Sequence, residues 1–409
     1  MLRRIVSLLL LLPVFFTPLP AFRLVPYGEE PPAAVTGAAE EAVAAAADAG
    51  AVEVSAPSAI LMDAATGAVL FEKNADERRE PASVTKIMTL LLVMEAIDDG
   101  RISMNDMVTA SETAAGKGGS QIYLEEGEQL SMDEMLKSVV VSSANDCATA
   151  LAEHVAGSEA AFVAMMNERA AQLGMTNTHF VNCTGLDDGP EAKDHLTTAR
   201  DVAIMSRELL RHDRIRDYTT IWMDTVRNGQ FGLSNTNKLV RFYDGTTGLK
   251  TGYTSAAGHC VSATAKRDGI ELIAVILGGA TSSERFSDAK ALLNYGFANF
   301  ALVTPDEGVT LGAIPVKLGT EEALTPVLVA NGPILISRSR LSSVRRTVEL
   351  EPLLEAPVER GQQVGVLRIT AGGTVLKTVP LVAAADVPKL TFGQIFDRIL
   401  RLVFTGKER

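Results

Sequence analysis

The sequence predicts an α+β protein, with helices and antiparallel strands mixed over residues 57–300 and a small all-β domain, expected to be a β-sandwich, over residues 301–388. The chain has 409 residues, more than one compact domain usually holds. Residues 87–97 are apolar at almost every position, as in a buried helix. Residues 259–277 hold two strand-like runs around an Asp-Gly pair, which predicts an antiparallel hairpin.

The N-terminus predicts export. Arg3 and Arg4 precede an apolar run over residues 5–16, which is shorter than the roughly 20 residues that a membrane-spanning helix needs. This pattern is typical of a secretory signal peptide, expected over residues 1–21, with an uncleaved signal anchor as the alternative. Residues 22–56 are rich in Ala, Glu, Gly and Pro and predict a linker. We therefore expect the protein in the cell envelope, at the outer face of the cytoplasmic membrane.

Local patterns define further elements before residue 300. Residues 60–62 and 69–71 are apolar runs separated by a Gly-containing turn, which predicts a pair of short strands. Residues 131–134, Ser-Met-Asp-Glu, form a capping box that predicts the start of a helix. We also expect hairpin turns at two Asp-Gly pairs, Asp244-Gly245 and Asp268-Gly269.

The region after residue 300 holds short Val- and Leu-rich runs separated by Gly and Pro, with no cluster of acids, bases or nucleophiles. We expect strands at 309–311, 316–318, 327–329, 348–350, 364–367 and 375–376. Residues 389–409 carry apolar side chains at helical spacing with Arg398 and Arg401 on the other side, which predicts an amphipathic helix lying on the membrane surface. A helix docked on its own β domain is the alternative.

The composition excludes several classes of protein. The formal net charge of −12 argues against nucleic acid as a partner, because such binders carry a surplus of Lys and Arg. The cysteines are Cys147, Cys183 and Cys260, too few for a disulfide scaffold, and we interpret them as buried packing, with pairing of Cys183 and Cys260 left open. We expect no metal and no cofactor, since neither Cys nor His residues show metal-ligand spacing.

The first candidate catalytic motif is Ser83-x-x-Lys86. Residues three apart lie on one face of a helix, so the two side chains are neighbours. A serine needs a base to become a nucleophile, and burial in an apolar helix lowers the pKa of a lysine towards that role. The motif alone also occurs by chance in chains of this length.

The second motif is Ser143-x-Asn145. Two residues apart point away from each other on a continuous helix, so these side chains converge only in a break, which we expect over residues 142–146. There a hydroxyl relays protons and an amide holds a substrate carbonyl. A helix junction with local caps is the alternative.

The third motif is Lys250-Thr251-Gly252, expected on an edge strand. Lys250 would supply a cation for a carboxylate and lower the pKa of Lys86 by repulsion. Gly252 leaves room for a substrate lying along the strand. The backbone N–H groups of Ser83 and Tyr253 are candidates for an oxyanion hole.

Together, in this order, the three motifs resemble those of the low-molecular-weight penicillin-binding proteins, the serine-type D-alanyl-D-alanine carboxypeptidases. The resemblance covers nearly the whole chain, and it extends to residues 119–127, 184–187, 197–201 and 235–239. It implies a β-lactamase/transpeptidase-like fold in which an antiparallel sheet is flanked by helices. It also implies removal of the terminal D-alanine from peptidoglycan stem peptides, and inhibition by β-lactam antibiotics.

Residue by residue, the resemblance implies that Ser83 is acylated, that Lys86 takes its proton and that Ser143 passes a proton to the leaving amine. Asn145 would hold the peptide, and Lys250 and Thr251 would bind the terminal carboxylate. Two positions depart from the family pattern, because Ala144 replaces a Gly and Tyr253 stands where some members have His. We interpret two further candidate bases, His179 and His195, as loop structure.

Two other functions are weighed against this one. A class A β-lactamase would need a Glu-x-x-x-Asn arrangement between the second and third motifs, and no Glu between Asn145 and Lys250 has Asn four residues on. A non-catalytic envelope-binding protein would not need all of the reacting groups, yet all are present.

Overall fold

The computed structural model describes residues 52–189, 191–329 and 331–405. The expected signal peptide and most of the expected linker lie outside the described residues.

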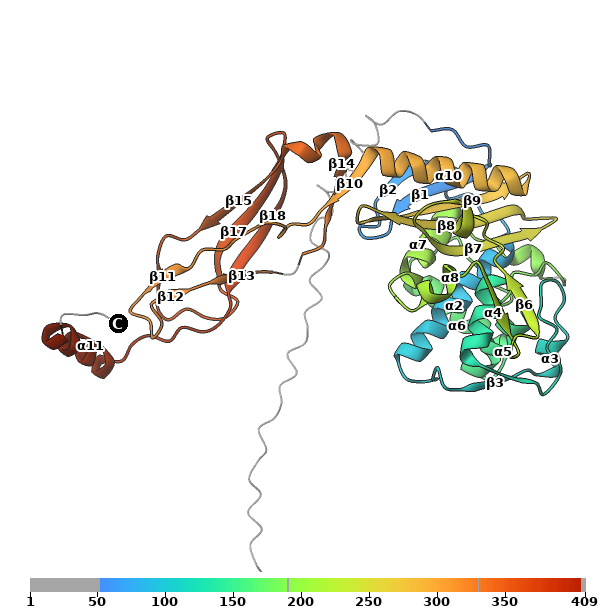
Figure 1. Ribbon diagram of the computed structural model, residues 1–409, viewed down its shortest axis with the longest axis horizontal. Coiled ribbons are helices and arrows are strands. Elements are labelled where there is room, and N and C mark those ends of the chain that lie inside the picture. The colour runs from blue at the N-terminus through green and yellow to red at the C-terminus, as the bar shows by residue number, and fades with distance from the viewer. Residues whose placement is uncertain (1–51, 190, 330, 406–409) are drawn as a thin grey trace, which may run out of the picture. The chain divides into compact units, whose positions relative to one another are not determined.

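The centre of the larger region is a five-stranded antiparallel sheet in the order β2-β1-β9-β8-β7 (Figure 1). The strands are β1 (Ser58–Asp63), β2 (Val69–Lys73), β7 (Thr246–Thr254), β8 (Gly258–Arg267) and β9 (Ile270–Gly279). The central strand β9 is apolar apart from Glu271 and is buried on both faces. Strand β7 is at the edge of this sheet, as the third motif predicts.

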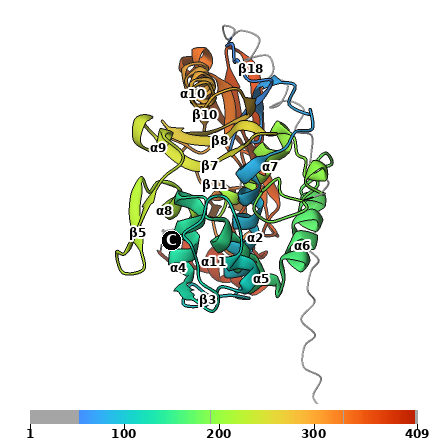
Figure 2. The ribbon, with the colours of Figure 1, turned by 90° about the vertical axis from the view of Figure 1, so that its right-hand side faces the viewer.

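Helices cover both faces of this sheet (Figures 1 and 2). Helix α10 (Ser282–Asn299) lies along one face, against β8 and β9. On the other face, α7 (Ala199–Leu209) contacts the sheet and packs on α2 (Lys86–Asp98), which is buried on almost every side, as its apolar sequence predicts. Helices α5 (Asn145–Ala156) and α6 (Glu159–Gln172) also pack on α2, and α4 (Met132–Val141) packs on α5.

Short elements complete this region: β3 (Met107–Thr109), α3 (Glu112–Ala115), β4 (Gln129–Ser131), α8 (Ile215–Thr219), β5 (Met223–Val226), β6 (Phe231–Ser234) and α9 (Leu239–Phe242). The hairpin at Asp268-Gly269 is confirmed, since both residues have the positive φ that its tight turn requires. The prediction of a hairpin at Asp244-Gly245 is wrong. That turn joins α9 to β7, because the residues before it form a short helix.

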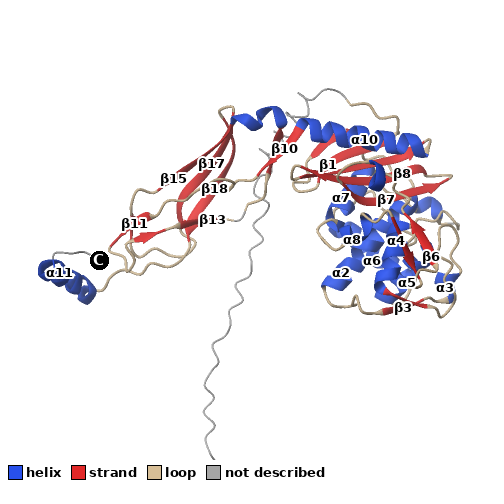
Figure 3. Cartoon of the chain, viewed as in Figure 1, coloured by secondary structure: helices blue, strands red, loops and turns tan. Residues whose placement is uncertain are grey.

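The region after residue 300 consists largely of strands (Figure 3). Strand β10 (Phe300–Val303) pairs with β14 (Ile334–Ser337). A four-stranded sheet has the order β13-β18-β17-β15, and a three-stranded one the order β12-β11-β16. Their bounds are β11 (Ile314–Lys317), β12 (Ala323–Leu324), β13 (Pro326–Leu328), β15 (Val344–Leu350), β16 (Leu354–Glu355), β17 (Gln363–Ala371) and β18 (Thr374–Ala383).

This β region has its own apolar clusters, including Ile336, Leu367 and Val379 in one of them. The expected strand over 309–311 is wrong, because these residues form a loop whose side chains Val309 and Leu311 pack on that cluster without ladder pairing.

The C-terminal helix α11 (Phe392–Thr405) confirms the predicted amphipathic helix in form. Its apolar side chains are exposed, with Phe392 at 84% and Phe404 at 80% of full exposure. Within the described part of the chain, no helix combines the length and the apolar character needed to cross a membrane.

Candidate active site

Ser83 lies in a single 3-10 turn, η1 (Ala82–Thr85), which leads directly into α2 at Lys86. The sequence predicts Ser83 in the first turn of an α-helix, whereas the structure places it in this tighter turn. With three residues per turn, positions three apart eclipse each other. The Lys86 Nζ therefore lies 2.9 Å from the Ser83 Oγ and donates a hydrogen bond to it.

Lys86 is fully buried, and its ammonium has three oxygen acceptors. Besides Ser83, these are the Asn145 Oδ1 at 2.5 Å and the Thr184 carbonyl at 2.8 Å. Burial lowers the pKa of Lys86 to about 7, although the nearby Asp146 carboxylate opposes the shift. Desolvation is therefore the main cause, and repulsion from Lys250 is not needed to explain it.

Ser143 lies in a break between α4, which ends at Val141, and α5, of which Asn145 is the first residue. The break is shorter than the expected 142–146. Ser143 has a left-handed φ of 64°, a conformation that residues other than glycine seldom adopt. The Ser143 Oγ is buried and has no hydrogen-bond partner.

The loop before β4 fixes the amide of Asn145. The Asn145 Nδ2 donates to the Gly118 carbonyl at 2.7 Å, and the Asn145 backbone N–H donates to the Ser120 carbonyl at 2.7 Å. A Cβ on Gly119 would lie 2.8 Å from the Asn145 Nδ2, so only glycine fits there without movement. With its nitrogen held by this loop, Asn145 presents its oxygen to Lys86.

Strand β7 brings the third motif against the turn that contains Ser83. A Cβ on Gly252 would lie 2.9 Å from the Ser83 backbone nitrogen, so the strand passes close only because Gly252 lacks a side chain. Lys250 is buried and donates to the Thr251 carbonyl at 2.9 Å, and burial, followed by the charges of Lys86 and Arg285, lowers its pKa well below the usual value. Tyr253 is exposed.

The side chains of Thr251 and Tyr253 on β7 contact residues of other elements. Thr251 Oγ1 donates to Thr236 Oγ1 at 2.7 Å, which joins β7 to the loop before α9. The ring of Tyr253 stacks on His259 of β8 with 4.4 Å between ring centroids. Sequence reasoning assigned no role to His259, whose Nδ1 is buried without a partner.

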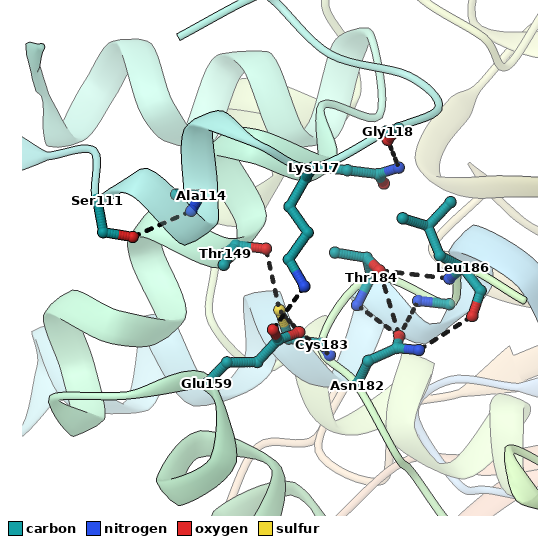
Figure 4. Close-up of polar contacts among 12 residues, drawn as sticks. Ser111, Ala114, Lys117, Gly118, Thr149, Glu159, Asn182, Cys183, Thr184 and Leu186 are labelled. Carbon is teal, nitrogen blue, oxygen red and sulfur yellow. Dashed lines mark hydrogen bonds and ion pairs between the residues drawn. The ribbon is translucent and has the colours of Figure 1, made fainter. Parts of the chain in front are cut away.

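The residue that provides the third acceptor for Lys86, Thr184, belongs to a turn that the sequence analysis left without a role (Figure 4). Asn182 Oδ1 accepts hydrogen bonds from the backbone N–H groups of Thr184 at 3.1 Å and Gly185 at 2.7 Å. Its Nδ2 donates to the Leu186 carbonyl at 3.0 Å. Asn182 thus closes the turn that aims the Thr184 carbonyl at Lys86. The Asn-x-Thr-Gly pattern is the signal in the sequence that could have indicated it.

A half-buried ion pair between Lys117 and Glu159 lies beside the turn that contains Thr184 (Figure 4). Lys117 Nζ lies 2.6 Å from Glu159 Oε2, and the Cys183 thiol donates to Glu159 Oε1 at 3.2 Å. Lys117 precedes Gly118, so the pair ties the loop that holds Asn145 to helix α6. Burial, followed by the Glu159 charge, raises the pKa of Cys183, which keeps it a thiol.

The interpretation of the cysteines as buried packing is confirmed, because Cys147, Cys183 and Cys260 are all buried and unpaired.

Arg285, on α10, is a second functional candidate that the sequence analysis missed. Its Nη1 donates to the Gly252 and Cys260 carbonyls, each at 3.0 Å, and its Nε is buried without a partner. Burial lowers the pKa of Arg285 to about 10, which still leaves it charged at neutral pH. Arg285 therefore places a positive charge next to the Gly252 carbonyl.

A buried lysine hydrogen-bonded to a serine hydroxyl is the arrangement of serine hydrolases whose base is a lysine, and the fold and site place the protein in this class. Within the class, the chain belongs to the peptidase S11 family of D-alanyl-D-alanine carboxypeptidases, whose model matches residues 42–281. Residues 297–389 match the model of the penicillin-binding protein 5 C-terminal domain. The protein is thus a serine-type D-alanyl-D-alanine carboxypeptidase.

Individual relatives agree with this assignment. The D-alanyl-D-alanine carboxypeptidase DacF of Bacillus subtilis is 40% identical over 344 residues, which cover 82% of this chain and 87% of the relative. DacC of Escherichia coli is 35% identical and covers 85% and 88% of the two chains. Penicillin-binding protein 5 from Haemophilus influenzae is similar in structure, with a TM-score of 0.69, 31% identity and coverage of 83% and 99%.

Proposed function

We propose that Ser83 is the nucleophile and Lys86 the general base of this carboxypeptidase. The observation that carries the proposal is the 2.9 Å hydrogen bond between Lys86 Nζ and Ser83 Oγ in a buried site where the pKa of the lysine is about 7. A neutral lysine at this position accepts the serine proton as the Ser83 Oγ attacks the carbonyl carbon of the penultimate D-alanine.

The bond from that carbon to the nitrogen of the terminal D-alanine then breaks, and an ester forms on Ser83. We assign to Ser143, whose buried Oγ has no other hydrogen-bond partner, the relay of the proton from the Lys86 ammonium to the leaving amine. Asn145, held by Gly118 and Lys86, is assigned to the peptide side of the substrate. Water attacks the ester, releases the shortened peptide and restores the proton of Ser83.

The terminal carboxylate of the substrate is assigned to Lys250 and Thr251 on β7. Supporting this, the charged Arg285 lies behind β7, close enough to Lys250 for its charge to lower the pKa of that lysine. The backbone N–H groups of Ser83 and Tyr253 are assigned to the oxyanion hole, because Gly252 allows the two segments to touch.

Binding of β-lactam antibiotics is part of the proposal. Penicillin-binding protein D2 from Listeria monocytogenes, 31% identical with a TM-score of 0.55, is known in an ampicillin-bound form and covers 61% of this chain. A β-lactam attacked by Ser83 would remain attached as an ester.

Labelling with a fluorescent penicillin tests these assignments. The full chain should acquire a covalent label and release D-alanine from a diacetyl-Lys-D-Ala-D-Ala peptide. Ser83→Ala should do neither, whereas Ser158→Ala, which removes the N-cap hydroxyl of α6, should do both. Absence of both activities in the wild-type chain would favour the envelope-binding alternative, and rapid continuous nitrocefin turnover would favour a β-lactamase.

We further propose export to the cell envelope and attachment of α11 to the membrane surface, with the division into signal peptide, linker, catalytic domain, β domain and helix given above. The exposed apolar side chains of α11 support this. Arg398 and Arg401 form ion pairs with Glu322 and Asp397, and we propose that they exchange these partners for anionic headgroups at the membrane. A chain ending at residue 389 should lose sedimentation with anionic phospholipid vesicles and keep its penicillin labelling. Equal sedimentation of both chains would contradict the attachment.

A further inference from the structure

The residue before the nucleophile has an unfavourable backbone conformation. Ala82 has a φ of 47°, in the left-handed region that side chains other than glycine seldom adopt, and it is almost completely buried. Backbone strain of this kind persists only where the surrounding structure holds it. The position of the Ser83 backbone and hydroxyl depends on this conformation, because Ser83 follows directly.

The carbonyl of Ala82 is held from two sides. Thr85 Oγ1 lies 2.8 Å from the Ala82 oxygen and donates its hydroxyl proton to it. Gly185, from the turn that also presents Thr184 to Lys86, approaches so closely that a Cβ there would lie 1.9 Å from the same oxygen.

His195 forms a hydrogen bond with the side chain of Thr85. Its Nε2 lies 2.8 Å from Thr85 Oγ1, and its Nδ1 lies 3.2 Å from the backbone nitrogen of Val181. Val181 N–H is a donor, so Nδ1 must be the unprotonated acceptor. The single hydroxyl proton of Thr85 is directed at Ala82, so Nε2 must carry the ring proton and donate it. Only the neutral Nε2–H form of His195 satisfies all three contacts.

The surroundings of His195 favour this neutral form and hold it in place. Burial, followed by the charges of His179 and Lys86, lowers the pKa of His195 to about 4. The adjoining chain is fastened by backbone pairs, with Thr197 bonded in both directions to Arg79 and Leu196 to His179. Phe180 contacts the imidazole edge to face, at 5.6 Å between ring centroids.

We propose that His195 and Thr85 are positioning residues that hold the strained Ala82 peptide and thereby set the Ser83 hydroxyl for attack. The inference rests on the proposed role of Ser83 as nucleophile. His195 is not a base in this scheme, because both of its ring nitrogens are engaged away from Ser83. This role goes beyond the interpretation of His195 as loop structure, because the hydrogen bonds of His195 lead through Thr85 to Ala82, the residue before Ser83.

Four variants of the full chain test the proposal, with the rate of acylation by a fluorescent penicillin measured separately from its binding affinity. Thr85→Val removes the hydroxyl at nearly constant volume, and it should slow acylation about 10- to 100-fold with little change in affinity, because small displacements of a nucleophile have effects of this size. Thr85→Ser keeps the hydroxyl and should restore the rate. His195→Gln keeps an N–H donor for Thr85 and should acylate faster than His195→Leu.

A matched control separates positioning from general loss of stability. Ser206→Ala also removes a buried hydroxyl, which contacts Ser262 at 2.8 Å, and it should lower the melting temperature without slowing acylation. Equal acylation rates for Thr85→Val and wild type would overturn the proposal, as would equal slowing by Thr85→Ser. If Thr85→Val does not fold, the order of the two His195 variants decides. A wild-type chain that takes no label would instead refute the proposed function.

Discussion

The pKa of Lys86 makes the pH dependence of acylation the sharpest test of the mechanism. In the proposed mechanism the neutral lysine is the base, so the rate should rise with pH as the ammonium loses its proton. With a pKa of about 7, the neutral fraction is about one-tenth at pH 6, half at pH 7 and nine-tenths at pH 8. Acylation by a fluorescent penicillin, followed by stopped flow, should therefore rise roughly tenfold from pH 6 to pH 8 and then level off.

An ordinary lysine would behave differently. With the unperturbed pKa of 10.5, only about 0.3% would be neutral at pH 8, and the rate would still increase tenfold per pH unit there. Asp146→Asn provides a control, because it removes a carboxylate that opposes the shift, so the inflection should move to lower pH. A rate that does not vary between pH 6 and 8 would refute the role of Lys86 as base, and a rate that rises without levelling above pH 8 would refute its lowered pKa.

Two further predictions concern the break before α5 and the turn after Asn182. Ser143→Ala should reduce the acylation rate about 100-fold, as loss of a proton-transfer group does. It should leave thermal stability almost unchanged, because the Ser143 Oγ has no hydrogen-bond partner. An unchanged acylation rate would remove Ser143 from the mechanism. Gly157 and Gly185 share a φ of 79°, but only Gly185 has atoms in the way, with Ala82 O at 1.9 Å from an added Cβ. Gly157→Ala should therefore lower the free energy of unfolding by about 1 kcal/mol in a urea titration. Gly185→Ala should lower it by several times as much and abolish penicillin labelling. Equal losses of stability in the two variants would show that the contact with Ala82 relaxes easily.

The elements predicted most successfully are those with a strong local signal. The capping box at Ser131 does begin α4, with both of its hydrogen bonds present, because it depends on four consecutive residues. The dipeptide Asp-Gly predicted a hairpin at two places, and this prediction is correct at residues 268–269 and wrong at residues 244–245. A dipeptide specifies a tight turn, but whether two strands flank it depends on what the neighbouring segments pack against.

What the sequence by itself determined is the set of candidate reacting groups, because Ser83, Lys86, Ser143, Asn145 and the third motif are short patterns whose proposed chemistry follows from residue type and spacing. Only the tertiary structure decided how these groups are held. The third acceptor of Lys86 comes from Thr184 and is 98 residues away along the chain, and the contact of His195 with Thr85 spans 110 residues. No local pattern encodes such pairs, because they depend on how the segments pack together. The pKa of Lys86 belongs to the same category, since burial, which only the folded chain provides, is its main cause.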